Sequence, residues 1–300
     1  MKVNKKRVKE LITSLLDHTP QSPTPERSDF AIMELGQLAA EPDGISVLKL
    51  LVKTYQTVEE VERKSVRKAC LEAIHHAATK QSTLAPIIKF LEEELSQGNE
   101  DYYLIASLAR AYVNNQSSRP LRELLLHEND DISHIARESV KEAAIDGQSM
   151  EFLIPTLVQL LKSSDGPSSL LASNVLLHAA RNGQDLSRAT VPLVRAMGRK
   201  DGRIAARSAA ALAYLRGHKV SLKPHIGSIT RMLEGWSQET ERRVVIEALR
   251  RYAARGREEA GDVLQAMRKV HGLDKRAITR DFMNELEKRA GKLRLIRRRR

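Results

Sequence analysis

Five prolines divide the middle of the chain into segments of nearly equal length. Successive members are 34, 35, 37 and 32 residues apart, and each is followed by apolar residues at helical spacing. Proline is tolerated in the first turn of a helix, where backbone N–H groups have no partner within the helix. Each segment therefore predicts the first helix of a unit of about 35 residues. The five are Pro86, Pro120, Pro155, Pro192 and Pro224.

An independent series of residues marks a second helix in each unit. Arg67, Arg137, Arg207 and Arg242 are separated by 70, 70 and 35 residues, and an alanine follows each of them by six positions. Small and apolar residues fill most positions between, which favours a helix that packs closely against its neighbours. Together the two series predict about eight helix–turn–helix units over residues 3–291.

The period, the proline in the first helix and the Arg-with-Ala pattern in the second resemble HEAT repeats. The resemblance is clearest over residues 28–256. It implies an all-α fold, an α-solenoid superhelix of about eight two-helix repeats, and it says little about function. In that family the arginine commonly pairs with an acid in an adjacent turn, and Asp131 and Asp201 stand six residues before Arg137 and Arg207. Units three and five depart from the pattern, because Tyr102 and Ala172 stand where the arginine is expected.

The two ends of the chain are expected to differ from the repeats. Residues 1–27 predict an N-terminal helix and a Pro/Ser linker that together form an irregular cap, either as a full repeat or as a free arm. The prolines and serines of Thr19–Ser28 are not expected to continue a helix. Residues 28–291 form the predicted solenoid, and residues 292–300 predict a basic, disordered tail.

Composition agrees with a helical protein inside the cell. Aromatic residues make up only 4% of the chain, which is not typical of a β-rich protein. Cys70 is the only cysteine, so an internal disulfide and a cysteine-based metal cage are excluded. No stretch approaches the ~20 apolar residues of a membrane span, and Met1–Leu16 lacks the apolar core of a secretory signal. We therefore expect a cytoplasmic protein.

The sequence predicts no enzyme. Its nine histidines do not cluster at metal-binding spacing, and the adjacent His75 and His76 point about 100° apart on a helix. Di-iron hydroxylases of HEAT-like fold need several His–Glu pairs, whereas His127–Glu128 is the one such dipeptide. HEAT-like DNA glycosylases hold a nucleotide against tryptophans, and Trp236 is the only one here. We expect no catalytic residue, no metal and no cofactor.

Charge is distributed unevenly along the chain. The net charge is +12, but residues 1–180 carry 20 basic and 25 acidic side chains, whereas residues 181–300 carry 30 and 13. Second helices usually line the concave face of such a superhelix. Basic residues on the second helices of the last three units would therefore form a stripe along that face, and the Arg-rich tail would continue it. The predicted binding residues are Arg203, Arg243, Arg250, Lys275, Arg276, Arg280, Arg297, Arg298, Arg299 and Arg300.

Three interpretations of the stripe stay open. Acids such as Glu247 and Glu285 could neutralise it through pairs four residues apart and leave only a solvated surface. It could bind an acidic protein segment, as a scaffold or adaptor would, and this is the preferred hypothesis. It could instead bind nucleic acid or a ribonucleoprotein through phosphates, although scarce aromatics argue against single strands. The preferred hypothesis predicts that reversing Arg243 and Arg250 abolishes binding at little cost in stability, whereas changing Arg207 destabilises the fold.

Overall fold

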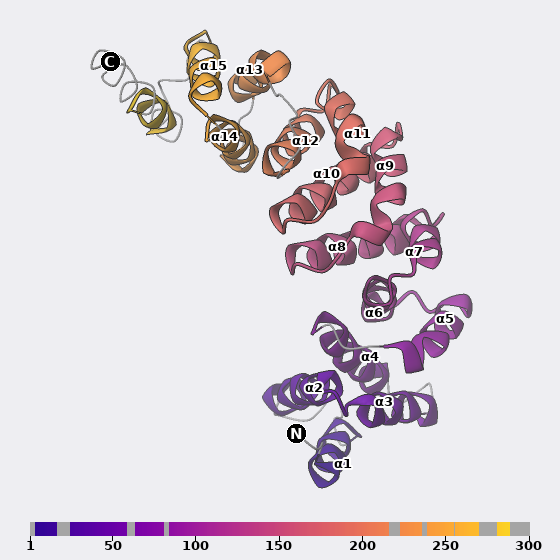
Figure 1. The fold of residues 1–300 in the computed structure, drawn as a ribbon. Helices are drawn as coiled ribbons and strands as arrows, with labels where there is room; N and C mark the ends of the chain where they lie inside the picture. The colour runs from indigo at the N-terminus through magenta and orange to yellow at the C-terminus, as the bar shows by residue number, and fades with distance from the viewer. Residues whose placement is uncertain are drawn as a thin grey trace. The chain divides into compact units, whose positions relative to one another are not determined.

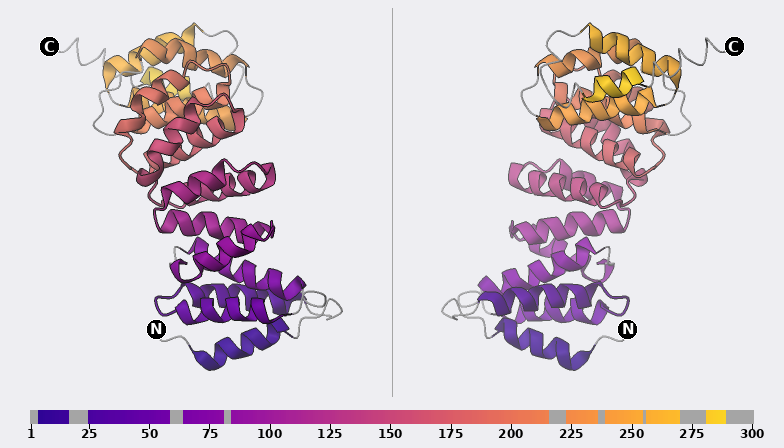
Figure 2. Two further views of the ribbon diagram at one scale, coloured as in Figure 1. Left: turned by 90° about the vertical axis from the view of Figure 1, so that its right-hand side faces the viewer. Right: turned by 90° about the vertical axis from the view of Figure 1, so that its left-hand side faces the viewer.

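The computed structural model describes residues 4–16, 25–58, 64–80, 84–215, 223–235, 239–254, 256–269 and 281–288. All regular secondary structure in these ranges is helical (Figure 1). The chain divides into two compact units, Met1–Gln148 and Ser149–Arg300. Within each unit the helices stack layer upon layer (Figure 2). In the described part of the chain no helix is long and apolar enough to span a membrane.

The first unit contains four helix pairs. The second helix of each pair packs on the second helix of the next, so that α2, α4, α6 and α8 form a continuous row. The pairs are α1 (Lys5–Leu16) with α2 (Pro25–Ala40), α3 (Ile45–Thr57) with α4 (Lys64–Thr79), α5 (Ile88–Ser96) with α6 (Tyr102–Asn114), and α7 (Ser118–Leu125) with α8 (Asp130–Ile145).

The second unit repeats this plan. Its second helices α10, α12 and α14 again pack on one another, and 3-10 turns lead into most of the first helices. The last repeat pairs α15 with a helical segment at residues 281–288. The named helices are α9 (Ile154–Lys162), α10 (Gly166–Arg181), α11 (Thr190–Ala196), α12 (Gly202–Tyr214), α13 (Ile226–Gly235), α14 (Glu239–Ala253) and α15 (Arg257–Arg268).

The periodic prolines lie where the sequence predicts them. Each is in the first turn of a first helix or in the 3-10 turn before it, for example Pro155 in α9 and Pro86 in the turn Ala85–Ile87. The patterned alanines are buried between second helices, as Ala73 and Ala143 illustrate. The described residues thereby confirm an all-α solenoid of stacked helix pairs. Its assignment to HEAT repeats in particular stays a prediction.

Polar side chains fix where the second helices begin. Asp101, Asn129, Asp165 and Asp201 precede α6, α8, α10 and α12, and each accepts hydrogen bonds from backbone N–H groups of the first turn. Those N–H groups have no partner within the helix, so such caps stabilise the helix start. Successive caps are 28, 36 and 36 residues apart, which extends the sequence period to the turns.

The structural arginines differ in part from the prediction. Arg207 donates from Nε to the amide oxygen of Asn174, whereas the Asp201 carboxylate accepts from Arg203. The expected Asp201–Arg207 contact is therefore replaced by two others. The third repeat has a buried arginine of its own. Arg110 on α6 is only 2% exposed and forms an ion pair with Asp146 at the end of α8.

The N-terminal segment forms a repeat rather than a free arm. Helix α1 packs on α2, and the Arg7 guanidinium donates two hydrogen bonds of 2.8 and 2.6 Å to the Glu34 carboxylate. The expected linker is wrong at its end, since α2 begins at Pro25. Proline starts this helix because its ring fixes a helical φ and its missing N–H is not needed there. Residues 17–24 and the predicted tail lie outside the described residues.

Candidate functional site

The structure describes three of the ten predicted binding residues. Arg203 lies at the start of α12, and Arg243 and Arg250 lie on α14. All three are exposed. The remaining seven lie outside the described residues, namely Lys275, Arg276, Arg280, Arg297, Arg298, Arg299 and Arg300.

Arg203 is held by the acid that caps its own helix. Its NH2 group donates to Asp201 Oδ2 at 3.0 Å, and its Nε donates to Oδ1 at 3.3 Å. The hydrogen bond from Arg203 lowers the pKa of the Asp201 carboxyl, which outweighs the effect of burial. The charge of Arg203 is thus largely balanced locally.

Arg250 joins α14 to the last helical segment. Its Nε donates to Glu285 at 3.0 Å, and its guanidinium carbon lies 5.4 Å from the ring centroid of Phe282, which is fully buried. Reversing this charge would place two carboxylates together and remove a cation–π contact. These contacts predict instead that reversing Arg250 lowers the stability of the fold.

A cluster that we call the α14 face lies on the second helices of this unit. Arg243, Glu247 and Arg251 are four residues apart on one side of α14. The Glu247 carboxylate accepts hydrogen bonds from Arg181 of α10 and from the hydroxyl of Tyr214 of α12. The Tyr214 ring also faces two guanidinium carbons, 4.3 Å away for Arg251 and 5.7 Å for Arg181.

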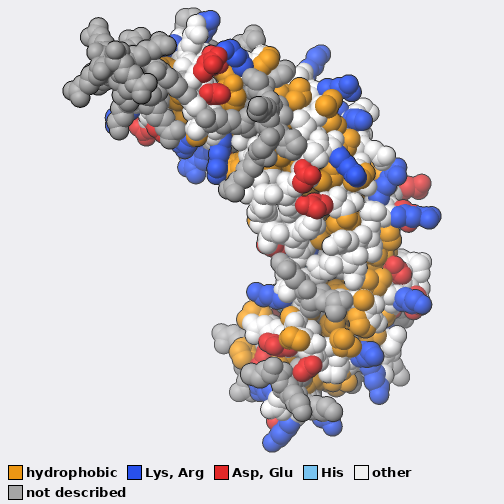
Figure 3. All heavy atoms as spheres, in the orientation of Figure 1, with side chains coloured by type: hydrophobic (Ala, Val, Ile, Leu, Met, Phe, Trp, Pro, Cys, Tyr) orange, Lys and Arg blue, Asp and Glu red, His pale blue; other side chains and the backbone are white. Residues whose placement is uncertain are grey.

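The α14 face keeps an excess of positive charge. Among the side chains that the structure describes there, three arginines outnumber one glutamate, and Lys and Arg side chains gather beside α14 on the surface (Figure 3). The acids Glu247 and Glu285 do neutralise part of the predicted stripe. They act on residues one or two repeats away, however, and not through pairs four residues apart.

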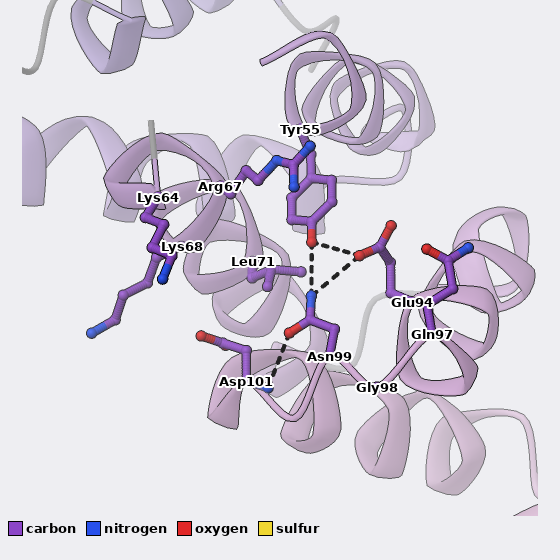
Figure 4. Close-up of a pocket in the computed structure, with 10 residues that line it drawn as sticks. All are labelled: Tyr55, Lys64, Arg67, Lys68, Leu71, Glu94, Gln97, Gly98, Asn99 and Asp101. Carbon is purple, nitrogen blue, oxygen red and sulfur yellow. Dashed lines mark hydrogen bonds between the residues drawn. The ribbon is translucent and has the colours of Figure 1, made fainter. Parts of the chain in front are cut away.

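The first unit contains a groove that the sequence does not predict. It lies where the end of α3, the start of α4 and the turn between α5 and α6 meet, and its volume is about 920 Å³ (Figure 4). We call it the α4 groove. It is lined by Tyr55, Lys64, Arg67, Lys68, Leu71, Glu94, Gln97, Gly98, Asn99 and Asp101.

One wall of the α4 groove is a closed hydrogen-bond network. The Tyr55 hydroxyl donates to Glu94 Oε2 at 2.6 Å, and Asn99 Nδ2 donates to both the Tyr55 oxygen and Glu94 Oε2, at 2.8 and 3.2 Å. Burial and the Glu94 carboxylate raise the pKa of Tyr55, so the phenol stays protonated. Asp101 is also engaged, because it caps α6. Both acids of the groove are therefore satisfied within the fold.

The opposite wall carries three cations on one helix. Lys64, Arg67 and Lys68 lie at the beginning of the described part of α4. The Arg67 guanidinium carbon lies 5.1 Å from the Tyr55 ring centroid, and Lys68 Nζ lies 5.9 Å from that of Tyr103. Within the described ranges, neither lysine forms an ion pair.

An aromatic cluster adjoins the α4 groove. The His75 ring centroid lies 5.7 Å from Tyr103 and 6.2 Å from Tyr102, and Tyr102 is 46% exposed. The His75 Nδ1 atom is buried without a hydrogen-bond partner. Burial, with smaller effects from Arg110 and His76, lowers the pKa of His75 from 6.5 to about 4. The imidazole is therefore neutral at pH 7. Among the residues that the structure describes, no group of three His, Cys, Asp or Glu side chains is placed to hold a metal.

Comparisons with known proteins do not identify a family for this chain. No protein-family model and no curated protein sequence matches the chain. A crystal structure of an engineered protein matches 95% of this chain and 77% of its own, at 17% identity and a TM-score of 0.47. A computationally designed armadillo repeat protein for modular peptide recognition matches 70% of this chain and 100% of its own, at 18% identity and a TM-score of 0.37. Likeness at these levels says nothing about what this chain binds.

Proposed function

We propose that this chain is a non-enzymatic intracellular scaffold that binds an acidic segment of another protein on its second helices. The proposal rests chiefly on the α14 face, where Arg181 binds the Glu247 carboxylate, Arg181 and Arg251 face the Tyr214 ring, and Arg243 lies one turn before Glu247 on the same side of α14. Planar guanidinium groups bind carboxylates with two hydrogen bonds, and arginine and tyrosine are enriched among the residues that dominate protein interfaces. Arg203, Arg250 and the Arg297–Arg300 tail belong to the proposed surface as supporting charge.

The proposed binding is tested with a fluorescein-labelled peptide of alternating Glu and Gly and the full chain. We expect R243Q/R251Q to weaken binding at least tenfold in 0.1 M salt. Arg188 and Arg195 form the matched control, since both are exposed in the same unit but lie in the first-helix layer. R188Q/R195Q removes the same charge and should change affinity less than twofold. Equal losses in the two variants would show charge attraction without a defined site and would refute the proposal.

Nucleic acid is the second candidate, favoured by the excess of arginine over residues 181–300. Both ligands would show salt-dependent binding, so salt does not distinguish them. A pull-down with the full chain, with and without nuclease, does distinguish them. If protein partners vanish after digestion, or if a duplex RNA of equal charge binds more tightly than the acidic peptide, the scaffold proposal fails.

A further inference from the structure

The α4 groove is a local positive site within an acidic unit. Residues 1–148 carry 19 basic and 23 acidic side chains, so the unit as a whole does not attract anions. Within the groove, Glu94 is bound by Tyr55 and Asn99, and Asp101 by backbone N–H groups of α6. Lys64 and Lys68 have no such partner in the described part of the chain. The uncompensated charge of the groove is therefore positive.

The two lysines lie on one side of the groove. Both are exposed and four residues apart on α4, so they present their charge on the same face of the helix. Exposed cations that form no ion pair among the described residues favour a role in binding an anionic group.

The groove is too large for a single anion, and one of its lysines faces an aromatic ring outside the lining. Its volume of about 920 Å³ lies near the upper end of ligand pockets, ~300–1,000 Å³. Lys68 faces the Tyr103 ring, and Tyr103 in turn contacts His75 and Tyr102. A bound segment whose carboxylates meet the lysines would place a neighbouring side chain over these rings.

We propose that the α4 groove is a second docking site, independent of the α14 face, for an acidic peptide segment that carries an aromatic residue. The carboxylates of the peptide pair with Lys64 and Lys68. Its aromatic ring packs on Tyr102 and Tyr103 in an offset-stacked or edge-to-face arrangement, which aromatic pairs prefer. A peptide fits better than a nucleic acid, because a peptide can confine its negative charge to the carboxylates that meet the two lysines, whereas every nucleotide adds a phosphate that the acidic unit repels. A chain of phosphates would meet repulsion outside the two lysines.

The test uses the full chain carrying R243Q/R251Q, so that the α14 face does not contribute. The probes are fluorescein-labelled peptides Glu-Glu-Tyr-Glu-Glu-Phe and the same peptide with alanine at both aromatic positions. We expect K64Q/K68Q to weaken binding of the aromatic peptide at least tenfold in 0.1 M salt. The matched control is K49Q/K53Q, because Lys49 and Lys53 are also exposed and four residues apart but lie on α3 outside the groove. It should change affinity less than twofold.

The aromatic part of the proposal has its own variant. Tyr102→Ala should weaken the aromatic peptide more than threefold and leave the alanine peptide unchanged. Unchanged melting of K64Q/K68Q by circular dichroism confirms that the fold is intact. Equal losses from the two lysine pairs, or no difference between the peptides in Tyr102→Ala, would overturn the site as described. The proposal would also fail if a DNA oligonucleotide of equal charge bound more tightly than the aromatic peptide and K64Q/K68Q abolished that DNA binding. Failure of the α14 face alone would leave these outcomes unaffected.

Discussion

His75 provides a test of the packing between α4 and α6. Its imidazole lies against Tyr102 and Tyr103, and its Nδ1 is buried without a hydrogen-bond partner. Phenylalanine has a similar shape and cannot take up a proton. We therefore predict that His75→Phe makes the protein more resistant to acid than the wild type, with little change in stability at pH 7.5.

The size of the effect follows from the pKa of His75, which burial lowers from 6.5 to about 4. Between these values the unfolded chain binds a proton that the folded chain does not bind, so stability falls as pH falls through this window. Above pH 6.5 the imidazole is neutral in both states and contributes no pH dependence. Each unit of pKa shift corresponds to about 1.4 kcal/mol, so a full shift of this size would destabilise the fold by about 3 kcal/mol at pH 4.

The assay is urea unfolding of the wild type and of His75→Phe between pH 7.5 and 4.5, followed by circular dichroism. Titrating carboxylates affect both proteins, and their contributions cancel in the difference between the two free energies of unfolding. That difference should grow by about 2.5 kcal/mol in favour of the variant from pH 7.5 to 4.5. A difference that stays constant over this range would show that His75 is not held neutral by burial, and the described packing would be wrong.

Three further predictions concern contacts between repeats and helix caps. Arg110→Ala should lower the free energy of unfolding by about 3 kcal/mol, because it removes a buried side chain. Arg110→Met should cost much less, because its partners Glu142 and Asp146 are 47% and 45% exposed and remain hydrated. Arg250→Glu should lower the melting temperature and the added change Glu285→Arg should restore part of it, with a coupling of at most about 1 kcal/mol because both side chains are partly exposed. Asp165→Ala should destabilise by about 1 kcal/mol through loss of the α10 cap, measured by urea unfolding, and a loss below about 0.3 kcal/mol would argue against that cap.

The stack of helices can be predicted well from the sequence, because the same positions are buried in every helix pair. Every unit must place small and apolar residues at the same positions of its second helix, so the period of Pro86 to Pro224 and the alanine series report the architecture directly. Polar contacts are less predictable, although they too follow the period. Arg250–Glu285 and Lys223–Glu258 each join residues 35 apart, which a search for pairs within one helix does not find.

The α4 groove could not be predicted because three separate segments form it. Tyr55 and Glu94 are 39 residues apart, and their contact depends on how the turn between α5 and α6 lies against α3. One signal was present in the sequence. Tyr102 interrupts the arginine series, and in the structure it belongs to the aromatic cluster beside the groove.

The only cysteine of the chain lies on the helix that carries the groove. Cys70 is fully buried on α4, and burial raises the pKa of its thiol to about 12. A thiol reagent can reach it only while α4 is locally open, because thiolate formation needs solvent. The rate of alkylation therefore measures how often this repeat opens, without any added label. A ligand that bridges α4 and α6 would slow alkylation in proportion to its occupancy. The alkylation rate of the native thiol therefore reports ligand binding in the groove.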